Sequence, residues 1–483
     1  MTEKYDVVVV GGASAGFAAA AAAKEAGAEK VLVLEKATRD LVGGNCRYSL
    51  MGFRFVHDGT DELMQLIPEH ERAEHARARV APYTKEKFIA DLNRVTRGRI
   101  DSELAEVLAD DSRDAIAWMT SLGHKWRFRN PVDMGDYTHY DPGTAVCPVD
   151  GGLGLVERWI KIAEGMGIDF RTESSVTGLL GDYRGVHGVQ VDGPQGRYEV
   201  ECDSVILASG GFQASAERRG RYLEQNADLM KVRGSRHNTG EVLQMAIDLG
   251  AKTAGQWQGA HASPVDLDTP PAEIDDSVNR YAYPFGITVN AEAKRFFDEA
   301  EAHRTYTYAK TGWAVLRENG GYAFQIYDQK SVEYFPVEYA QATPIVADSI
   351  PELAEKLGLD PAALTTTVDE FNSAIDQSVP FDATKDDGRR THGLTPNKSN
   401  WCLTIEEGPF LAYRVTAGIT FTFGGLAVNR DSQVLNQSGQ PMKGLFATGD
   451  ILGLFFHNYP SCTGMTRNVV FGGRAGAAAA GVL

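Results

Sequence analysis

A glycine-rich turn near the N-terminus offers the first recognisable chemistry in the chain. Residues 5–10 (YDVVVV) predict a buried strand, and the turn GGASAG then leads into an alanine-rich helix. Gly11 permits a tight turn, and Gly16 lets the helix approach the strand closely. The free N–H groups at the start of such a helix bind a pyrophosphate. Glu35 ends the next predicted strand, where a carboxylate accepts hydrogen bonds from a ribose. The pattern predicts a dinucleotide site.

One position of this turn departs from the usual pattern. Ala13 stands where the second glycine of G-x-G-x-x-G is usual, so the backbone is more crowded where the phosphates pass. An ordinary βαβ unit that binds nothing is the alternative interpretation. The strand, the helix and Glu35 together favour the nucleotide, but the turn does not distinguish NAD from FAD.

A second strand-and-turn motif near the C-terminus makes that distinction. Residues 444–448 (GLFAT) predict a strand that delivers Gly449 and Asp450 to a turn. A carboxylate there can bind the ribityl hydroxyls of a flavin, whereas NAD has no ribitol. The helix predicted from Gly464 can stabilise negative charge on the N1–C2=O edge of a reduced flavin. Together with the GGN at residues 43–45, these motifs predict FAD.

Composition excludes several classes of protein. The 483 residues carry a net charge of −17, which argues against nucleic acid or an anionic membrane as a partner. No segment has the length of a transmembrane helix or the form of a signal peptide, so the cytoplasm is the expected location. The five cysteines form no CxxC pair and the histidines no HxxxH pattern, so we expect neither a metal site nor a second redox centre.

The order of predicted elements places a different block between two nucleotide-binding segments. A charged helical region is expected over residues 60–122, and a helix over 151–162. β-rich sequence then runs from residue 169 to 207 and ends at a second small-residue turn, ASGG. Aromatic residues and prolines increase between residues 259 and 415, where helices are expected over 351–357 and 361–375. Strands over 426–429 and 444–448 and a helix from 464 close the chain.

Taken in order along the chain, the motifs GGASAG, LEK, GGN, ASGGF, TGE, VNAEAKRFFDE and GLFATGD resemble a flavoprotein family. This family comprises fumarate reductases, succinate dehydrogenase flavoprotein subunits and 3-ketosteroid dehydrogenases. Segments 304–310, 398–401 and 418–425 are similar to its tricarballylate dehydrogenase branch. The resemblance implies an α/β, Rossmann-like FAD-binding domain built from residues 1–258 and 417–483. It also implies an inserted α+β capping domain over residues 259–416.

The resemblance assigns a set of residues to the cofactor. No histidine occurs in residues 43–49 to bond to the flavin, so the FAD is expected to be non-covalent. The positions expected to contact it are Gly11, Ala13, Ser14, Ala15, Gly16, Glu35, Lys36, Gly43, Gly44, Asn45, Ser49, Gly52, Val176, Ala208, Ser209, Gly210, Gly449, Asp450, Thr463, Gly464 and Met465.

The same resemblance implies catalytic residues in the inserted block. His261 falls near the family's carboxylate-binding histidine, and Arg304 near its proton-transferring arginine. The match to Arg304 is offset by one residue, because His303 occupies the literal position. Tyr306 is a further candidate for proton transfer. Arg304 as an ion-pair partner of Glu299 or Glu301, and His261 as a core residue, are the structural alternatives.

Two departures from the family pattern concern the substrate. Phe421 replaces a histidine that precedes Thr-x-Gly-Gly in fumarate reductases, and the segment 458–460 (NYP) replaces an arginine clamp. A simple fumarate or succinate specificity is therefore not expected. Arg467 is a candidate replacement for the clamp, and His457 and Tyr459 follow Asp450 towards the expected flavin face.

These residues predict an FAD-dependent enzyme that oxidises, or reversibly reduces, a C–C bond beside a carboxylate or ketone. Hydride passes between the substrate carbon and flavin N5, as in a tricarballylate dehydrogenase. A Δ1 desaturase of 3-ketosteroids or other cyclic ketones is one alternative, and a non-catalytic flavin-binding electron-transfer module is another. No second nicotinamide fingerprint is present, so the expected electron acceptor is external: a quinone, an iron–sulfur protein or oxygen.

Overall fold

The computed structural model describes residues 3–49, 52–129 and 131–481, which divide into two compact units. The first unit falls within residues 1–223, 234–260 and 421–483, and the second within 224–233 and 261–420. The first unit therefore draws on both ends of the chain. The functional domain boundaries at 258/259 and 416/417 stay a prediction.

An eight-stranded sheet forms the centre of the first unit. Five of its strands pair in parallel, in the spatial order β8 (Asp169–Arg171), β2 (Val31–Leu34), β1 (Glu3–Val10), β11 (Gly196–Leu207) and β21 (Pro441–Ala447). The antiparallel strands are β9 (Ser175–Asp182), β10 (Gly185–Gly193) and β20 (Gln433–Leu435). The strand, helix and strand predicted for residues 5–34 are confirmed.

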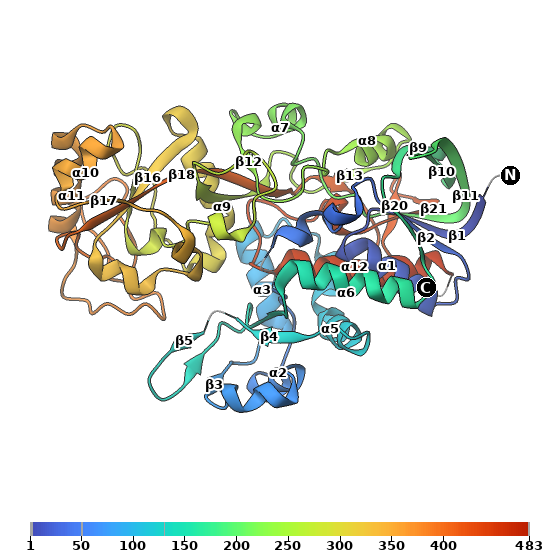
Figure 1. The fold of residues 1–483 in the computed structure, drawn as a ribbon, viewed down its shortest axis with the longest axis horizontal. Helices are drawn as coiled ribbons and strands as arrows, with labels where there is room; N and C mark the ends of the chain where they lie inside the picture. Colours follow the sequence, from blue (N-terminus) through green and yellow to red (C-terminus); the bar gives the residue numbers. More distant parts are fainter. Residues whose placement is uncertain (1–2, 50–51, 130, 482–483) are drawn as a thin grey trace. The chain divides into compact units, whose positions relative to one another are not determined.

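The sequence of β1 explains its central place. Val7, Val8 and Val9 are completely buried, as expected of a parallel strand covered on both faces. Helices α1 (Ser14–Glu25), α6 (Gly151–Gly165) and α12 (Thr463–Ala479) lie alongside one another in this unit (Figure 1). A Cβ on Gly476 of α12 would lie 2.2 Å from the carbonyl oxygen of Ala19 in α1, so glycine permits this close helix contact.

The helical region expected over residues 60–122 is interrupted in the structure. Pro68 precedes a 3₁₀ segment, and Arg97 ends a helix in the left-handed region with φ 55°. The prediction of a helical region is therefore correct, and the structure adds where each helix ends. Its helices are α2 (Thr60–Leu66), α3 (Lys85–Thr96), α4 (Ser102–Asp110) and α5 (Ser112–Ser121).

The remaining elements of the first unit are short. Its other helices are α7 (Ala216–Tyr222) and α8 (Glu241–Asp248), and its short strands are β3 (Ala78–Arg79), β4 (Trp126–Phe128), β5 (Val132–Asp133), β6 (Thr138–His139), β7 (Val146–Pro148), β13 (Thr253–Ala254) and β19 (Gly425–Leu426). The strand expected over residues 426–429 is shorter than predicted. The Asn429 side chain accepts hydrogen bonds from the N–H groups of Asp431 and Gln433, which makes a turn there.

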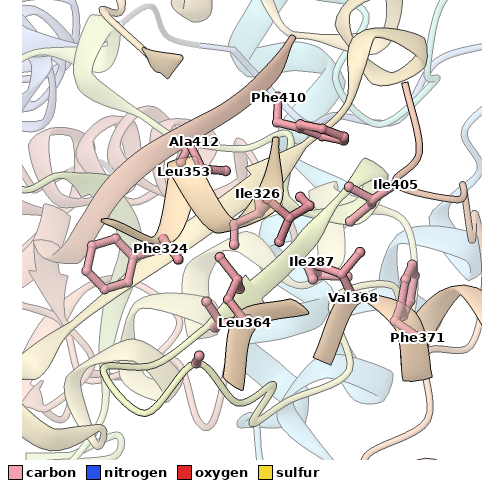
Figure 2. Close-up of a cluster of buried hydrophobic side chains, with 14 of the residues drawn as sticks. Ile287, Phe324, Ile326, Leu353, Leu364, Val368, Phe371, Ile405, Phe410 and Ala412 are labelled. Carbon is pink, nitrogen blue, oxygen red and sulfur yellow. The ribbon is translucent and has the colours of Figure 1, made fainter. Parts of the chain in front are cut away.

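The second unit pairs a sheet with α-helices. The sheet contains β12 (Lys231–Val232), β14 (Ala260–Asp266), β15 (Ile287–Val289), β16 (Tyr322–Tyr327), β17 (Ile345–Ala347) and β18 (Phe410–Thr422). Its helices are α9 (Tyr308–Leu316), α10 (Ile350–Leu357) and α11 (Pro361–Ala374), of which α10 and α11 confirm the predictions. Figure 2 shows side chains such as Ile287 and Ile326 from the sheet meeting Leu364 and Val368 from α11. This cluster gives the unit a hydrophobic core of its own.

Candidate functional site

Three adjacent parallel strands end together at one edge of the first unit's sheet. Val10 of β1 pairs with Leu207 of β11, which pairs in turn with Ala447 of β21. The turns that follow therefore lie side by side. Gly11 has φ 116°, and a Cβ there would lie 2.5 Å from the carbonyl oxygen of Ala208. Ligands of such sheets bind at this edge.

Helix α1 begins directly at that edge. No side chain caps its N-terminus at Ala13, so the N–H groups of its first turn are available to an anion. Ser14 and Ala15 are buried in this turn. A Cβ on Gly16 would lie 1.9 Å from the carbonyl oxygen of Gly11, so only glycine fits. This geometry suits a pyrophosphate.

The acid expected to bind the ribose is held firmly in place. Glu35 is 8% exposed, and its two carboxylate oxygens accept hydrogen bonds of 2.8 Å from the N–H groups of Gly12 and Ala37. Each oxygen keeps a second lone pair for a ribose hydroxyl. Gly12 is a site residue that the prediction missed, although it is the second glycine of GGASAG.

Two further candidates in this region are engaged within the protein. The Lys36 ammonium donates a 2.7 Å hydrogen bond to the Thr239 hydroxyl and pairs with Glu241. Val176 is buried in β9, where it pairs with Val191 of β10. Their predicted contacts with FAD remain predictions.

The loop of residues 43–49 contacts both the start of α1 and the start of α12. A Cβ on Gly44 would lie 3.5 Å from the Cβ of Ala13, and the Cys46 sulfur lies 4.0 Å from that of Met465. Burial raises the pKa of Cys46 to about 12, so this residue is a thiol at neutral pH. Cys46 is a second missed residue, since a lone cysteine carries no pattern.

Hydrogen bonds fix the same loop to the rest of the unit. The Asn45 side-chain oxygen accepts hydrogen bonds of 3.0 Å from the N–H of Ser235 and from the amide of Asn238. A Cβ on Gly210 would lie 2.9 Å from the side-chain oxygen of Asn238. Asn238 therefore lies between the Ala208–Gly210 turn and the loop of residues 43–49. The carbonyl oxygen of Ser49 accepts from Gly152. Asn238 is thus a further residue that the sequence did not indicate.

Asp450 lies where the third strand end meets α1. A Cβ on Gly449 would lie 2.9 Å from the Cβ of Ala15, so this turn touches the first turn of α1. The Asp450 carboxylate contacts the guanidinium of Arg467. Burial raises the pKa of Asp450, and the positive charge of Arg467 opposes that rise.

The N-terminus of α12 has no side-chain cap, and hydrogen bonds with Arg54 hold it in place. No side chain caps the helix at Cys462, and the Thr463 hydroxyl is buried without a hydrogen-bond partner among the described residues. Arg54 anchors this turn: its Nε donates to the Ser461 carbonyl at 2.8 Å, and its own carbonyl accepts from the Thr466 hydroxyl at 2.7 Å. Arg54 was not predicted, because nothing in its sequence context marks it.

Gly52 and Gly464 border this turn. A Cβ on Gly52 would lie 2.6 Å from the Cys462 sulfur, and one on Gly464 would lie 3.9 Å from the Phe421 ring and from Arg467. Gly52 is therefore packed closely against Cys462, whereas Gly464 keeps the start of α12 free of a side chain.

An aromatic cluster contains three of the residues predicted to face the substrate. Tyr459 packs edge-on against Phe421, with ring centres 5.2 Å apart, and both rings contact Phe455. Arg467 lies against Phe421 and Phe455. His457 is close to this cluster in sequence, and its neighbours include Arg97 and Arg99. Burial lowers the pKa of His457, and the positive charges of these two arginines lower it further.

The second unit holds the catalytic candidates of the inserted block. His261 is completely buried, and burial and the charge of Arg233 keep its pKa well below the usual value. Its ring lies 4.9 Å from that of Tyr308. His261 is therefore neutral and would act through a neutral ring N–H.

Arg304 and Tyr306 belong to one 3₁₀ turn, η7 (Arg304–Tyr306), and both are half-buried. The His303 side chain caps this turn, which is a structural role. Glu299 pairs with Arg295, and Glu301 pairs with Lys310. Within the described part of its unit, Arg304 therefore has neither of the ion-pair partners considered from the sequence.

The first unit fits FAD in the chemistry of its donors. Two uncapped helix N-termini, the Thr463 hydroxyl and the Arg467 guanidinium all offer donors that need acceptors, and FAD supplies phosphate, ribityl and ring oxygens. Among residues 3–49, 52–129 and 131–481, no cluster of three metal-ligating side chains is found. In the same part of the chain, no helix is long and apolar enough to cross a membrane.

Comparison with known proteins agrees with this geometry. The FAD binding domain family matches residues 6–465. The chain is 30% identical to the probable fumarate reductase Ifc3 of Shewanella frigidimarina, over 98% of this chain and 74% of that protein.

Two solved structures share the fold. An open flavocytochrome c3 fumarate reductase superposes with a TM-score of 0.73 at 27% identity, covering 99% of this chain and 78% of the other. The 3-ketosteroid Δ1-dehydrogenase of Sterolibacterium denitrificans superposes with a TM-score of 0.75 at 19% identity, over 99% and 100% of the two chains. The strand ends, the uncapped helix N-termini and the similar proteins all indicate FAD binding. The chain belongs to the FAD-binding family of fumarate reductase-like flavoproteins, as an FAD-dependent oxidoreductase acting on carbon–carbon bonds.

Proposed function

We propose that the enzyme oxidises a C–C single bond adjacent to a carboxylate, or in reverse reduces the corresponding C=C bond, with a polycarboxylic acid of the tricarballylate type as its substrate. The half-buried Arg304 carries this proposal. The two acids that could have neutralised it, Glu299 and Glu301, are paired with Arg295 and Lys310 instead. A partly buried guanidinium without a carboxylate partner in its own unit suits a carboxylate ligand, which it binds through two parallel hydrogen bonds.

The roles of the chain's own residues follow from their acidities. FAD, when bound, supplies the two-electron chemistry by exchanging hydride at N5. A carboxylate acidifies the neighbouring C–H bond, so a base must move one proton. Arginine is too basic to be that base at neutral pH, so we assign substrate binding to Arg304 and proton transfer to the Tyr306 hydroxyl in the same turn.

His261 would orient the substrate without adding charge. Because burial and Arg233 keep its pKa low, its ring is neutral throughout the physiological range. A neutral ring N–H can donate a hydrogen bond to a carboxylate oxygen or to a ketone oxygen alike. The positive charge that selects an acid would therefore come from Arg304.

A cyclic-ketone substrate is the second candidate. Phe421 and Tyr459 form an aromatic cluster with Phe455 where fumarate reductases, by resemblance, place a histidine and an arginine. Aromatic rings favour an apolar ring over a small diacid. In this alternative, Tyr306 or Tyr308 would polarise the ketone.

The electron acceptor is proposed to be external. Beyond the N-terminal turn, the sequence has no second nicotinamide-type glycine fingerprint. A quinone, a separate iron–sulfur protein or oxygen would then reoxidise the flavin, and a cytoplasmic location is proposed with it.

Substitution of Arg304 tests the acid-binding role. Arg304→Ala should keep its FAD but lose about 10³-fold in turnover with polycarboxylates, because the carboxylate is no longer positioned. Steady-state rates with an artificial dye acceptor measure this loss. Arg317→Ala is the matched control, since it removes an exposed arginine that pairs with Glu224 in the same unit. Near-normal turnover of Arg304→Ala would show that the assignment is wrong.

A further inference from the structure

Arg467 is a buried cation whose partners leave part of it unused. Its side chain is completely buried, and its Nη2 contacts the Asp450 carboxylate. Its guanidinium carbon lies 5.3 Å from the ring centres of both Phe421 and Phe455. Nε and Nη1 have no hydrogen-bond partner among the residues that the structure describes. Buried N–H groups without acceptors are costly, so this side of Arg467 needs a ligand.

Arg467 lies next to the start of its own helix, α12. A Cβ on Gly464 would lie 3.9 Å from Nη2 of Arg467, the atom that also contacts Asp450, so the first turn of the helix adjoins the guanidinium. That 17-residue helix has no side-chain cap, and the Thr463 hydroxyl beside it is buried without a partner in the described chain. The helix N-terminus and the arginine thus offer positive potential and donors to one place.

The path of an FAD molecule determines which of its parts reaches that place. The pyrophosphate site is at the start of α1, and Gly449 packs against Ala15 in that first turn. Asp450, the next residue, would therefore bind the ribityl chain that follows the pyrophosphate. The ring system, which follows the ribityl chain in the cofactor, would then lie beside the Asp450–Arg467 pair. Its N1–C2=O edge carries the acceptors that α12 and Arg467 lack.

We propose that Arg467, together with the N-terminus of α12, binds the N1–C2=O edge of the flavin and stabilises negative charge there. Arg467 would then serve the cofactor and not the substrate carboxylate. The planar guanidinium suits this role, because it can stack between Phe421 and Phe455 while one edge faces Asp450 and another the flavin. This also gives Phe421 a function in place of the family's histidine.

Sulfite measures this charge directly and needs no substrate. Its sulfur lone pair forms a bond to flavin N5, and the displaced electron pair remains as negative charge on the N1–C2=O edge. No other oxidant or reductant takes part. Sulfite affinity therefore reports how strongly the protein stabilises charge at that edge, and it is read from the bleaching of the flavin absorbance. A failure of the proposed substrate class would leave this measurement unaffected.

Arg467→Met should weaken sulfite binding at least tenfold at unchanged FAD content. The two-electron reduction potential should fall by about 30 mV, which corresponds to a tenfold change in the equilibrium. Arg467→Lys keeps the charge and should stay within about threefold of wild type. Arg474→Gln is the matched control on the same helix, where it removes a cation that pairs with Asp111 and Asp431, and it should change neither value.

A single result with FAD-loaded protein would overturn the proposal: sulfite affinity and potential of Arg467→Met equal to those of wild type. A raised KM for carboxylates with unchanged flavin properties would instead assign Arg467 to the substrate. If Arg467→Met fails to fold because Asp450 is left buried and unpaired, the double variant Arg467→Gln/Asp450→Asn removes both charges. Relative to Asp450→Asn alone, this double variant should bind sulfite tenfold more weakly at equal FAD content, and unchanged affinity would contradict the proposal.

Discussion

At the scale of single residues, buried ionisable groups decide how this enzyme responds to pH. His124 is 3% exposed and packs against Trp159, with ring centres 4.5 Å apart. Burial and the charge of Arg158 lower the pKa of His124 to about 3. The unfolded chain binds a proton at this residue below pH about 6.5, whereas the folded chain does not. The contribution of His124 to stability is therefore complete above pH 6.5 and decreases as the pH falls from there towards 3.

His124→Phe should remove this acid sensitivity while keeping an aromatic ring against Trp159. Between pH 7.5 and 5.5 the variant should lose about 1 kcal/mol less free energy of unfolding than wild type, because one proton-binding difference is gone. Denaturant unfolding at the two pH values measures this difference. The exposed His187 gives the control, since His187→Phe should follow wild type. Equal losses in wild type and His124→Phe would contradict the buried neutral state.

The residues that sequence reasoning found were those carried by glycine patterns. Gly11 and Gly16 lie against backbone atoms that exclude any side chain, as their spacing predicted. Asn238 and Arg54 were missed, because they act through single hydrogen bonds to Asn45 and Ser461, which join distant segments. The Asp450–Arg467 pair was also not predicted, because the two residues are 17 positions apart and no sequence pattern links them.

At the scale of elements, the packing of α1 on α12 brings the two ends of the cofactor site together. Adjacent glycines of α12 face different surroundings. A Cβ on Gly472 would lie 2.9 Å from the carbonyl oxygen of Ala15, whereas nothing lies within 4 Å of one on Gly473. A substitution at Gly473 therefore changes only helix propensity, whereas one at Gly472 also disturbs the contact between α1 and α12.

Gly472→Ala should destabilise the protein by about 1–3 kcal/mol, because α1 and α12 must move apart. FAD should also be released at a lower temperature, since both helix N-termini belong to its site. Gly473→Ala should be neutral or stabilising by up to about 1 kcal/mol, from helix propensity alone. Thermal unfolding followed by flavin fluorescence reports both effects. Equal behaviour of the two variants would contradict the close contact.

Elements with strong local signals were predictable, and irregular ones were not. The valine-rich β1 and the alanine-rich α1 were placed correctly, because burial and propensity agree there. The ends of α2 and α3 within the predicted helical region were not located, since a charged sequence with scattered prolines does not mark each helix end. The short β19 depends on the Asn429 turn, whose side-chain hydrogen bonds are a tertiary detail.

At the scale of the whole molecule, the chain combines an FAD-binding unit made from both ends with a second unit that has its own core. The first unit determines the cofactor, and the fold is shared with fumarate reductases and with a 3-ketosteroid dehydrogenase. A shared fold does not specify the substrate. The residues that would do so, Arg304, Tyr306 and His261, belong to the second unit.

Anaerobic reaction of the purified yellow protein with candidate substrates tests the central claim most directly. Saturated polycarboxylates such as tricarballylate should bleach the flavin absorbance within seconds, or the corresponding unsaturated acids should restore it to the chemically reduced protein. Cyclic ketones should do neither, because they carry no carboxylate for Arg304. If the flavin responds to cyclic ketones alone, or to no acid in either direction, oxidation or reduction beside a carboxylate is contradicted.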